Sequence, residues 1–168
     1  LQSLARNIAM DYVVTRVAQE ASTDGSDVAR STVYDYLAPL ERLMVLDPLE
    51  AWSSHLRSRA RLRTSPRVQF CDPSVAVAAL RTGPQQLLAD LNYFGYLFEA
   101  LVVRDLRVFA GAVDGTVQHY RDSDDLEIDA VVTAGDGRWA AFEVKLGHAD
   151  IDIAATNLLA FARKVDTT

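Results

Sequence analysis

Apolar residues recur every three to four positions in several segments of the chain, which is the spacing of an amphipathic helix. They predict long helices over residues 4–20, 33–46, 84–109 and 150–165, and a shorter helix that begins at Asp72-Pro73. Three later segments are strand-like and are separated by polar turns: 116–121, 127–133 and 138–145. The second half of the chain is therefore expected to run helix, three strands, helix.

The first half has the element order of a helix-turn-helix. The polar turn 22–26 separates two helices, and Thr32 is a candidate cap for the second one. Pro39 lies within that second helix, so we expect a kink or an early end there. The strand-like stretches 44–52 and 67–72 would then pair, and together with the helices they would form a winged helix.

These patterns predict an α/β (α+β) chain with two domains. Residues 1–72 would form a winged-helix-like domain and residues 73–168 a second domain, with the boundary lying within 72–86. A chain of 168 residues is long enough for two small domains. The sequence starts at Leu1 without a basic or apolar leader, so we expect it to be a piece of a longer protein.

Composition narrows the class of protein. With 49% hydrophobic and 24% charged residues the chain is expected to be globular. No apolar run approaches the roughly 18–20 residues of a membrane span, so we expect no membrane partner. The single cysteine, Cys71, cannot form an internal disulfide, which fits a reducing cytoplasm. We expect this cysteine to be a small buried hydrophobe rather than a nucleophile.

Charge is unevenly distributed along the chain. The net charge of −6 argues against a protein that coats nucleic acid with its whole surface. One basic segment nevertheless contains Arg57, Arg59, Arg61, Arg63 and Arg67, whereas residues 122–129 hold five acidic side chains and no basic one. On a wing, these arginines would contact DNA phosphates. A contact surface for another domain and a solvated loop are the alternatives.

Charged residues on two of the predicted strands form the candidate site. Glu127 and Asp129 are two residues apart, as are Glu143 and Lys145, so each pair shares one face of its strand. If the two strands are hairpin neighbours, all four groups can converge. Gathered carboxylates are the ligands that Mg²⁺ or Mn²⁺ takes. The alternative is that these are edge-strand charges that pair with one another or face water.

The order Asp129, then Phe142-Glu-Val-Lys145 at a strand end, resembles the PD-(D/E)XK nuclease superfamily. The core of that superfamily is a restriction-endonuclease-like helix, a meander of strands and another helix. The resemblance implies that Asp129, Glu143 and the Val144 carbonyl ligate Mg²⁺ or Mn²⁺, and that Lys145 positions the attacking water. The implied reaction is metal-assisted hydrolysis of nucleic-acid phosphodiesters.

Two further acids match the same superfamily. Glu99 stands where those enzymes often carry an acid on the first helix, and it would then be a catalytic or metal-binding group. Its alternative is a solvated helix residue. Glu127 would act as a ligand or as a partner of Lys145. On the last helix the match is weak, with Thr156, Asn157 and Lys164 as candidates and helix-surface positions as the alternative.

Four motifs in order make the resemblance more specific: Gly95-Tyr-Leu-Phe-Glu-Ala-Leu-Val-Val-Arg-Asp-Leu106, Tyr120-Arg-Asp122, Glu127-Ile-Asp129 and Phe142-Glu-Val-Lys145. Together they resemble the domain of unknown function at the C-terminal end of many bacterial and archaeal AAA-type P-loop ATPases. In that family a winged helix lies between the ATPase and a nuclease-like domain. The resemblance implies two partners, DNA and the ATPase domain of the parent chain.

The sequence also departs from that family. No G-x-x-x-x-G-K-[ST] motif is present, so ATP would bind only in a missing N-terminal part. The superfamily core normally has a fourth strand after its second helix, and the chain ends at Thr168. Without that strand a sheet edge would be exposed, from which we expect a homodimer. A catalytically inactive DNA- or protein-binding module of the same ATPase is the alternative function.

Overall fold

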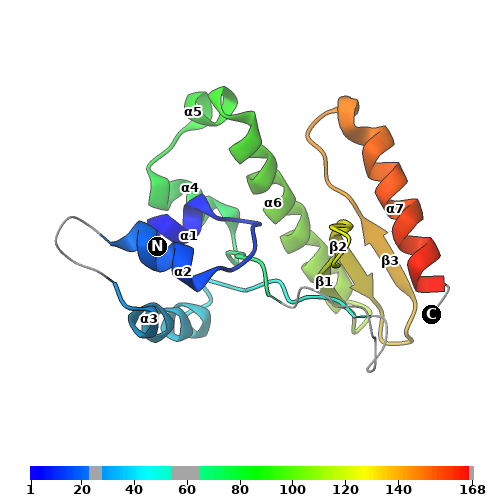
Figure 1. Cartoon of the computed structure of the whole chain (residues 1–168), viewed down its shortest axis with the longest axis horizontal. Coiled ribbons are helices and arrows are strands. Elements are labelled where there is room, and N and C mark those ends of the chain that lie inside the picture. Colours follow the sequence, from blue (N-terminus) through cyan, green and yellow to red (C-terminus); the bar gives the residue numbers. More distant parts are fainter. Residues whose placement is uncertain (23–27, 54–64, 167–168) are drawn as a thin grey trace. The chain divides into compact units, whose positions relative to one another are not determined.

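The computed structural model describes residues 1–22, 28–53 and 65–166. These residues form an α+β structure with seven α-helices, one 3₁₀ helix and a three-stranded antiparallel sheet (Figure 1). The expected mixed class is therefore confirmed. In the described part of the chain, no helix is both long enough and apolar enough to cross a membrane.

The chain divides into two compact units, and each unit is made of two separate segments of the sequence. The first comprises Leu1–Pro48 and Arg67–Ala100, and the second comprises Leu49–Pro66 and Leu101–Thr168. The chain thus leaves the first unit, returns to it and leaves again within one long helix. The domain boundary predicted from sequence, within 72–86, includes the break between α4 and α5 and stays a prediction.

The first unit is helical. It contains α1 (Gln2–Arg6), α2 (Val14–Ala21), α3 (Arg30–Arg42), α4 (Pro73–Leu80), α5 (Pro84–Ala89) and the start of α6 (Leu91–Gly111). Their apolar faces form one core around the fully buried Ile8 and Phe70. Asp72 begins α4 by accepting a hydrogen bond from the Ser74 amide at 2.8 Å, the expected cap of a helix that starts with proline.

The single helix predicted over residues 4–20 is wrong. Ala9 has a left-handed φ of 60°, and its amide donates to the Val68 carbonyl at 2.8 Å. The Val68 amide in turn donates to the Met10 carbonyl at 2.9 Å. Because these backbone groups pair with a distant segment, they cannot continue the helical ladder, and the chain forms α1 and α2 instead.

Two further helix predictions need correction. α3 begins at Arg30 with Ala29 as its N-cap, so the predicted Thr32 cap is wrong, and it ends at Arg42, three residues after Pro39. The helix predicted over 84–109 is split at Asp90. The Asp90 backbone is not helical, and its carboxylate accepts the Tyr93 amide at 3.0 Å, which starts a new helix.

Residues 67–71, which pair with Ala9 and Met10 through Val68, also pair with residues 45–47. The Asp47 amide donates to the Gln69 carbonyl at 3.0 Å, and the Cys71 amide donates to the Val45 carbonyl at 3.2 Å. Leu46 and Phe70 form the antiparallel bridge between these bonds. The two stretches that the sequence predicted to pair therefore do so over these few residues.

The second unit contains the sheet, with strands β1 (Thr116–Arg121), β2 (Glu127–Thr133) and β3 (Trp139–Phe142) in the order β1-β2-β3. The first two strands have the predicted bounds. β3 is shorter than predicted and ends before Glu143 and Lys145. A register shift between Gln118 and Tyr120 interrupts the β1–β2 pairing.

Helices pack against both faces of this sheet. Ala130 of β2 clusters with Val103 and Ala110 of α6, whereas its neighbour Val131 clusters with Phe161 of α7 (Ile151–Asp166). Alternating strand residues point to opposite faces, so β2 is covered on both sides. Figure 1 shows α7 lying along the sheet.

Phe161 anchors α7 to the sheet. Its ring is fully buried, with its centroid 4.8 Å from that of Tyr120 and 5.4 Å from those of Trp52 and Trp139. These edge-on contacts add to the stabilisation from burial. The C-terminal half of α7 is thereby anchored to aromatic side chains of β1 and β3.

Gly115 is expected to tolerate no side chain. A Cβ there would lie 3.0 Å from the Thr133 carbonyl oxygen and 3.1 Å from that of Ala110. Both atoms belong to the backbone, so relief requires a shift of β2 or of α6. We expect Gly115→Ala to lower the free energy of unfolding by about 1–3 kcal/mol, measured by urea denaturation.

Gly111→Ala is the matched control, because a Cβ at the end of α6 would meet no atom within 4 Å. It should leave the stability unchanged or raise it by about 0.5–1 kcal/mol. Equal effects of the two substitutions would contradict the close approach at Gly115.

Candidate active site

Three of the predicted residues meet at the end of β3. Lys145 Nζ donates to Glu143 Oε2 at 2.7 Å and lies 3.6 Å from Asp129 Oδ2. The side chains of Asp129 and Glu143 are 10% and 3% exposed, and that of Lys145 is 30% exposed. Two carboxylates thus share one ammonium group that solvent can still reach. We call Asp129, Glu143 and Lys145 the carboxylate–lysine cluster.

The backbone after β3 holds this cluster together. Phe142 pairs with Ala130 of β2 as the last residue of the ladder. The Val144 amide then donates to Asp129 Oδ2 at 2.8 Å, in place of a strand partner. The prediction that Glu143 and Lys145 lie on a strand is therefore wrong, because β3 ends at Phe142. The hydrogen bond from the Val144 amide nevertheless keeps both residues beside Asp129.

The pKa of the Glu143 carboxyl is raised above its usual value of 4.5. Burial is the main cause, and the negative charge of Asp129 acts in the same direction. Hydrogen bonds from Lys145 and from Asn157 of α7 lower this pKa but do not cancel the increase. The cluster is therefore a place where two carboxylates crowd in partly desolvated surroundings. Asn157, one of three weak candidates on the last helix, is the one that contacts it.

Glu143→Gln is expected to stabilise the fold above neutral pH. A carboxyl whose pKa is raised on folding must ionise at a cost once the pH exceeds its unfolded value. The variant should therefore exceed the parent in unfolding free energy at pH 8. The difference should shrink as the pH falls toward 4, as measured by denaturation at each pH. A variant that is less stable at pH 8 would contradict this.

The other two predicted acids have ion-pair partners of their own. Glu127 is half-exposed, and its Oε2 lies 3.9 Å from the Arg121 Nε. Glu99 is buried in α6 and its Oε1 accepts from Arg67 Nη1 at 2.8 Å, within the first compact unit. The role of each acid in catalysis stays a prediction.

The predicted DNA-contacting arginines are only partly described. Arg57, Arg59, Arg61 and Arg63 lie outside the described residues. Arg67 is described, and its side chain is 2% exposed in the ion pair with Glu99. DNA contact by Arg67 stays a prediction, and the ion pair gives this residue a structural role in the fold.

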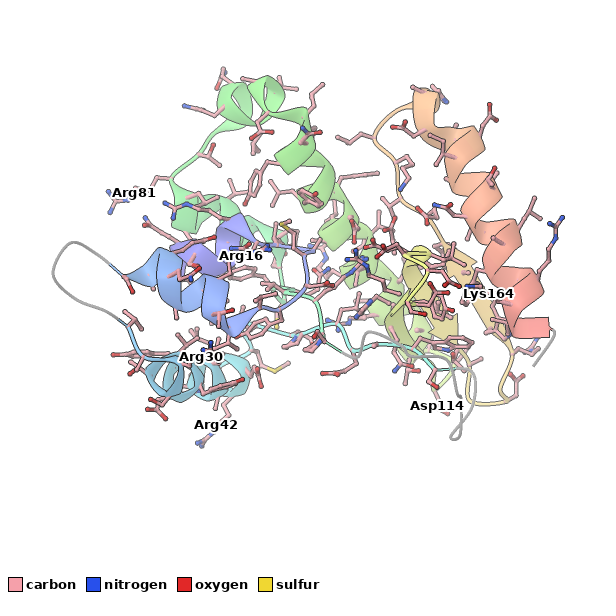
Figure 2. All side chains as sticks on the ribbon, viewed as in Figure 1. Arg16, Arg30, Arg42, Arg81, Asp114 and Lys164 are labelled. Carbon is pink, nitrogen blue, oxygen red and sulfur yellow. The ribbon has the colours of Figure 1, made fainter. Side chains whose placement is uncertain are left out.

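A second set of charged side chains holds the C-terminal end of α7. Asp122 is buried and accepts from Lys164 Nζ at 2.5 Å, from the Tyr120 hydroxyl at 3.0 Å and from two backbone amides. Figure 2 labels Lys164 on α7. Burial alone would raise the pKa of Asp122, but these hydrogen bonds outweigh it and lower the pKa. The bond to Asp122, followed by that to Asp124, raises the pKa of Lys164.

From the sequence, Asp122 was noted as part of an acidic cluster and of the motif Tyr120-Arg-Asp122, but its hydrogen-bonding arrangement was not predicted. The usable signal was the order Asp-Ser-Asp-Asp after a strand, since an aspartate there commonly accepts amides two to four residues on. The Asp122 carboxylate accepts hydrogen bonds from the amides of Asp124 and Leu126. Nothing in the pattern indicated that Lys164, 42 residues later, would complete this arrangement.

A cavity of about 370 Å³ opens beside the carboxylate–lysine cluster. The segment after β3 and the first turns of α7 form it, and its lining residues are Glu143, Lys145, Leu146, Gly147, His148, Ile151, Ala154, Ala155 and Leu158. The lining thus combines charged side chains from the segment after β3 with aliphatic side chains from α7. The cluster forms part of a concave surface and not of an exposed flat one.

The carboxylate–lysine cluster does not by itself hold a full set of metal ligands. Across residues 1–22, 28–53 and 65–166, no three His, Cys, Asp or Glu side chains come together to hold a metal ion. Asp129 and Glu143 supply two carboxylates next to the Val144 peptide. Mg²⁺ is commonly held by one or two carboxylates together with water, so this donor set is compatible with it.

Comparison with known proteins gives two family matches. Residues 94–168 match the family described as "Domain of unknown function (DUF4143)", a segment that covers all three strands and α7. Residues 1–86 match the family described as "Domain of unknown function (DUF8612)". No curated protein and no solved structure matches the chain. Since the second match covers half of the 168 residues, the chain belongs to the DUF8612 family, and its remainder is similar to DUF4143.

Proposed function

We propose that the second compact unit is a PD-(D/E)XK nuclease-like domain that hydrolyses nucleic-acid phosphodiesters with the help of Mg²⁺ or Mn²⁺. One observation carries the proposal. Asp129 of the middle strand meets Glu143 and Lys145, which follow the next strand. The Lys145 ammonium lies 3.6 Å from the Asp129 carboxylate and 2.7 Å from the Glu143 carboxylate. Strand-derived acids and a lysine in this order are the residues on which the resemblance to that superfamily rests.

Asp129, Glu143 and the Val144 carbonyl would hold the metal. The raised pKa of Glu143 supports this, since crowded carboxylates with a repelling neighbour gain most from a bound cation. When bound there, the ion would supply positive charge to a phosphate oxygen. Desolvation of both carboxylates strengthens their interaction with any cation.

Lys145 would act on the water and the phosphate. Its ammonium is held by two carboxylates and is still 30% exposed, so it can reach a substrate at the mouth of the cavity. There it would orient the attacking water and stabilise charge that develops on the phosphate. Asn157 would keep Glu143 in place through the hydrogen bond between them.

The first unit and the parent protein complete the proposal. The antiparallel bridge between Leu46 and Phe70, following two helices, supports a winged-helix-like arrangement that would present DNA. The arginines at 57, 59, 61 and 63 would then contact phosphates. An AAA-type ATPase domain of the parent chain and a second copy of this chain are the proposed protein partners, in the cytoplasm.

A catalytically inactive binding module is the second candidate. The observation that favours it is the pairing within the cluster: Glu143 is bonded to Lys145, and Asp129 to the Val144 amide. Charges that satisfy one another in this way also serve as a purely structural tie between β2 and the segment after β3.

Calorimetric titration with Mn²⁺ tests the metal site. The parent should bind Mn²⁺, and Asp129→Asn should weaken that binding at least about tenfold. Asp136→Asn is the control, because Asp136 is an exposed acid in a turn of the same unit and pairs only across the surface with Arg138 at 2.7 Å. Equal weakening by both variants, or no binding by the parent, would contradict the proposed metal site.

A further inference from the structure

The cavity beside the carboxylate–lysine cluster has a shape and lining that the proposed hydrolysis does not require. Its volume of about 370 Å³ lies in the range of small-ligand sites, whereas a scissile phosphate needs only the charged rim. Its inner wall is the start of α7, where Ile151, Ala154, Ala155 and Leu158 lie. Because the side chains of Ala154 and Ala155 are small, they leave space in the cavity beside α7.

The two segments that line the cavity differ in chemistry. Glu143, Lys145 and His148 of the segment after β3 offer polar groups, whereas the α7 residues offer only apolar side chains. Such a cavity fits a ligand with a flat apolar face and a polar edge. A nucleobase has this form, and proteins that accept an unstacked base hold it between apolar side chains and polar groups at its edge.

Glu143 and Lys145 belong to both the cluster and the cavity. A nucleotide with its phosphate at Lys145 would therefore have its own base beside the aliphatic side chains of α7. Inside a duplex that base is stacked and paired, and it could enter only after unstacking, which costs free energy. In a single strand or at a frayed end the cost is smaller.

We propose that this cavity holds one unpaired nucleobase, so that the substrate of the cluster is single-stranded nucleic acid or a frayed end. The inference rests on the proposed function for the phosphate at Lys145. The binding of the base itself does not require cleavage, and this allows the two proposals to be tested separately.

The test measures base binding directly, in EDTA to prevent cleavage. A single-stranded oligonucleotide with 2-aminopurine at one position becomes more fluorescent when that base is unstacked. The parent chain should raise this fluorescence, and Ala155→Leu, which fills the cavity from an exposed position on α7, should reduce the affinity at least fivefold. The control is Ala89→Leu, an exposed alanine on α5 outside the cavity, which should behave as the parent.

Small probes identify which part of the nucleotide binds. The four deoxynucleoside monophosphates should compete with the oligonucleotide, and inorganic phosphate should compete less well. Should Ala155→Leu fail to fold, His148→Ala removes an exposed ring from the segment after β3 and is expected to weaken nucleotide binding in the same assay.

Each outcome bears on one proposal. Unchanged fluorescence, equal competition by phosphate, or full affinity in Ala155→Leu and His148→Ala would overturn the base site. Cleavage of intact duplex without any fluorescence change would overturn it too and leave the nuclease standing. Base binding without cleavage when Mn²⁺ is added would support the cavity and count against the nuclease.

Discussion

Replacing Arg67 with methionine is expected to lower the free energy of unfolding by about 3–5 kcal/mol. The Arg67 and Glu99 side chains are 2% and 11% exposed and lie 2.8 Å apart at their closest atoms. Methionine fills much of the same volume but leaves the Glu99 carboxylate buried beside an apolar chain. Removing one partner of a buried ion pair is among the most destabilising single changes in a protein core. Urea denaturation at pH 7 measures the effect.

The double variant Arg67→Met, Glu99→Leu serves as the control for this prediction. With both charges removed, at least half of the lost stability should return, because the remaining side chains are apolar and of similar size. A single variant within about 1 kcal/mol of the parent would contradict the importance of the pair. If the double variant folds and still cleaves DNA, Glu99 is a structural residue and not the catalytic acid that the family resemblance implies.

Replacing Lys145 with methionine is expected to reduce cleavage of DNA by about 10²–10⁴-fold, the usual effect of removing a group that orients or activates the nucleophile. The ammonium lies 2.7 Å from the Glu143 carboxylate and 3.6 Å from the Asp129 carboxylate. Its loss should leave Mn²⁺ binding in place, because the two proposed carboxylate ligands remain. Cleavage rates and calorimetry on the same sample separate these effects.

Arg138→Met is the matched control, since it also removes one positive charge from the second unit. Arg138 is 85% exposed and pairs with Asp136 on the surface, so its replacement should change cleavage less than twofold. A Lys145→Met variant that cleaves as fast as Arg138→Met would show that the ammonium has only a structural role.

Periodicity predicted the second half of the chain well. β1 and β2 have the bounds expected from alternation, because their neighbours on both faces are apolar and the turns between them are polar. The breaks were harder to predict. The spacing of apolar residues does not reveal that the Ala9 amide donates to a distant carbonyl. Nor does it reveal that the Asp90 carboxylate accepts a nearby amide and so starts a new helix. Tertiary partners outweighed propensity at both places.

The candidate site was predictable in its residue types but not in its geometry. A two-residue spacing placed Glu143 and Lys145 on one strand face, whereas both follow the strand and are held by the Val144 amide. Glu127 and Asp129 have the same spacing, yet Arg121 lies next to Glu127. Strand parity cannot show where a strand ends, and the end of β3 decides which acids meet.

The most direct test of the nuclease proposal is cleavage of single-stranded and duplex DNA by the whole chain in Mn²⁺, compared with Glu143→Gln. This variant keeps the size and polarity of the side chain and removes the charge. We expect the parent to cut single-stranded DNA faster than duplex, to stop in EDTA, and to lose at least about 10²-fold in rate in the variant. Equal cutting by parent and variant, or a Mn²⁺-bound parent that cuts neither substrate, would contradict the proposal.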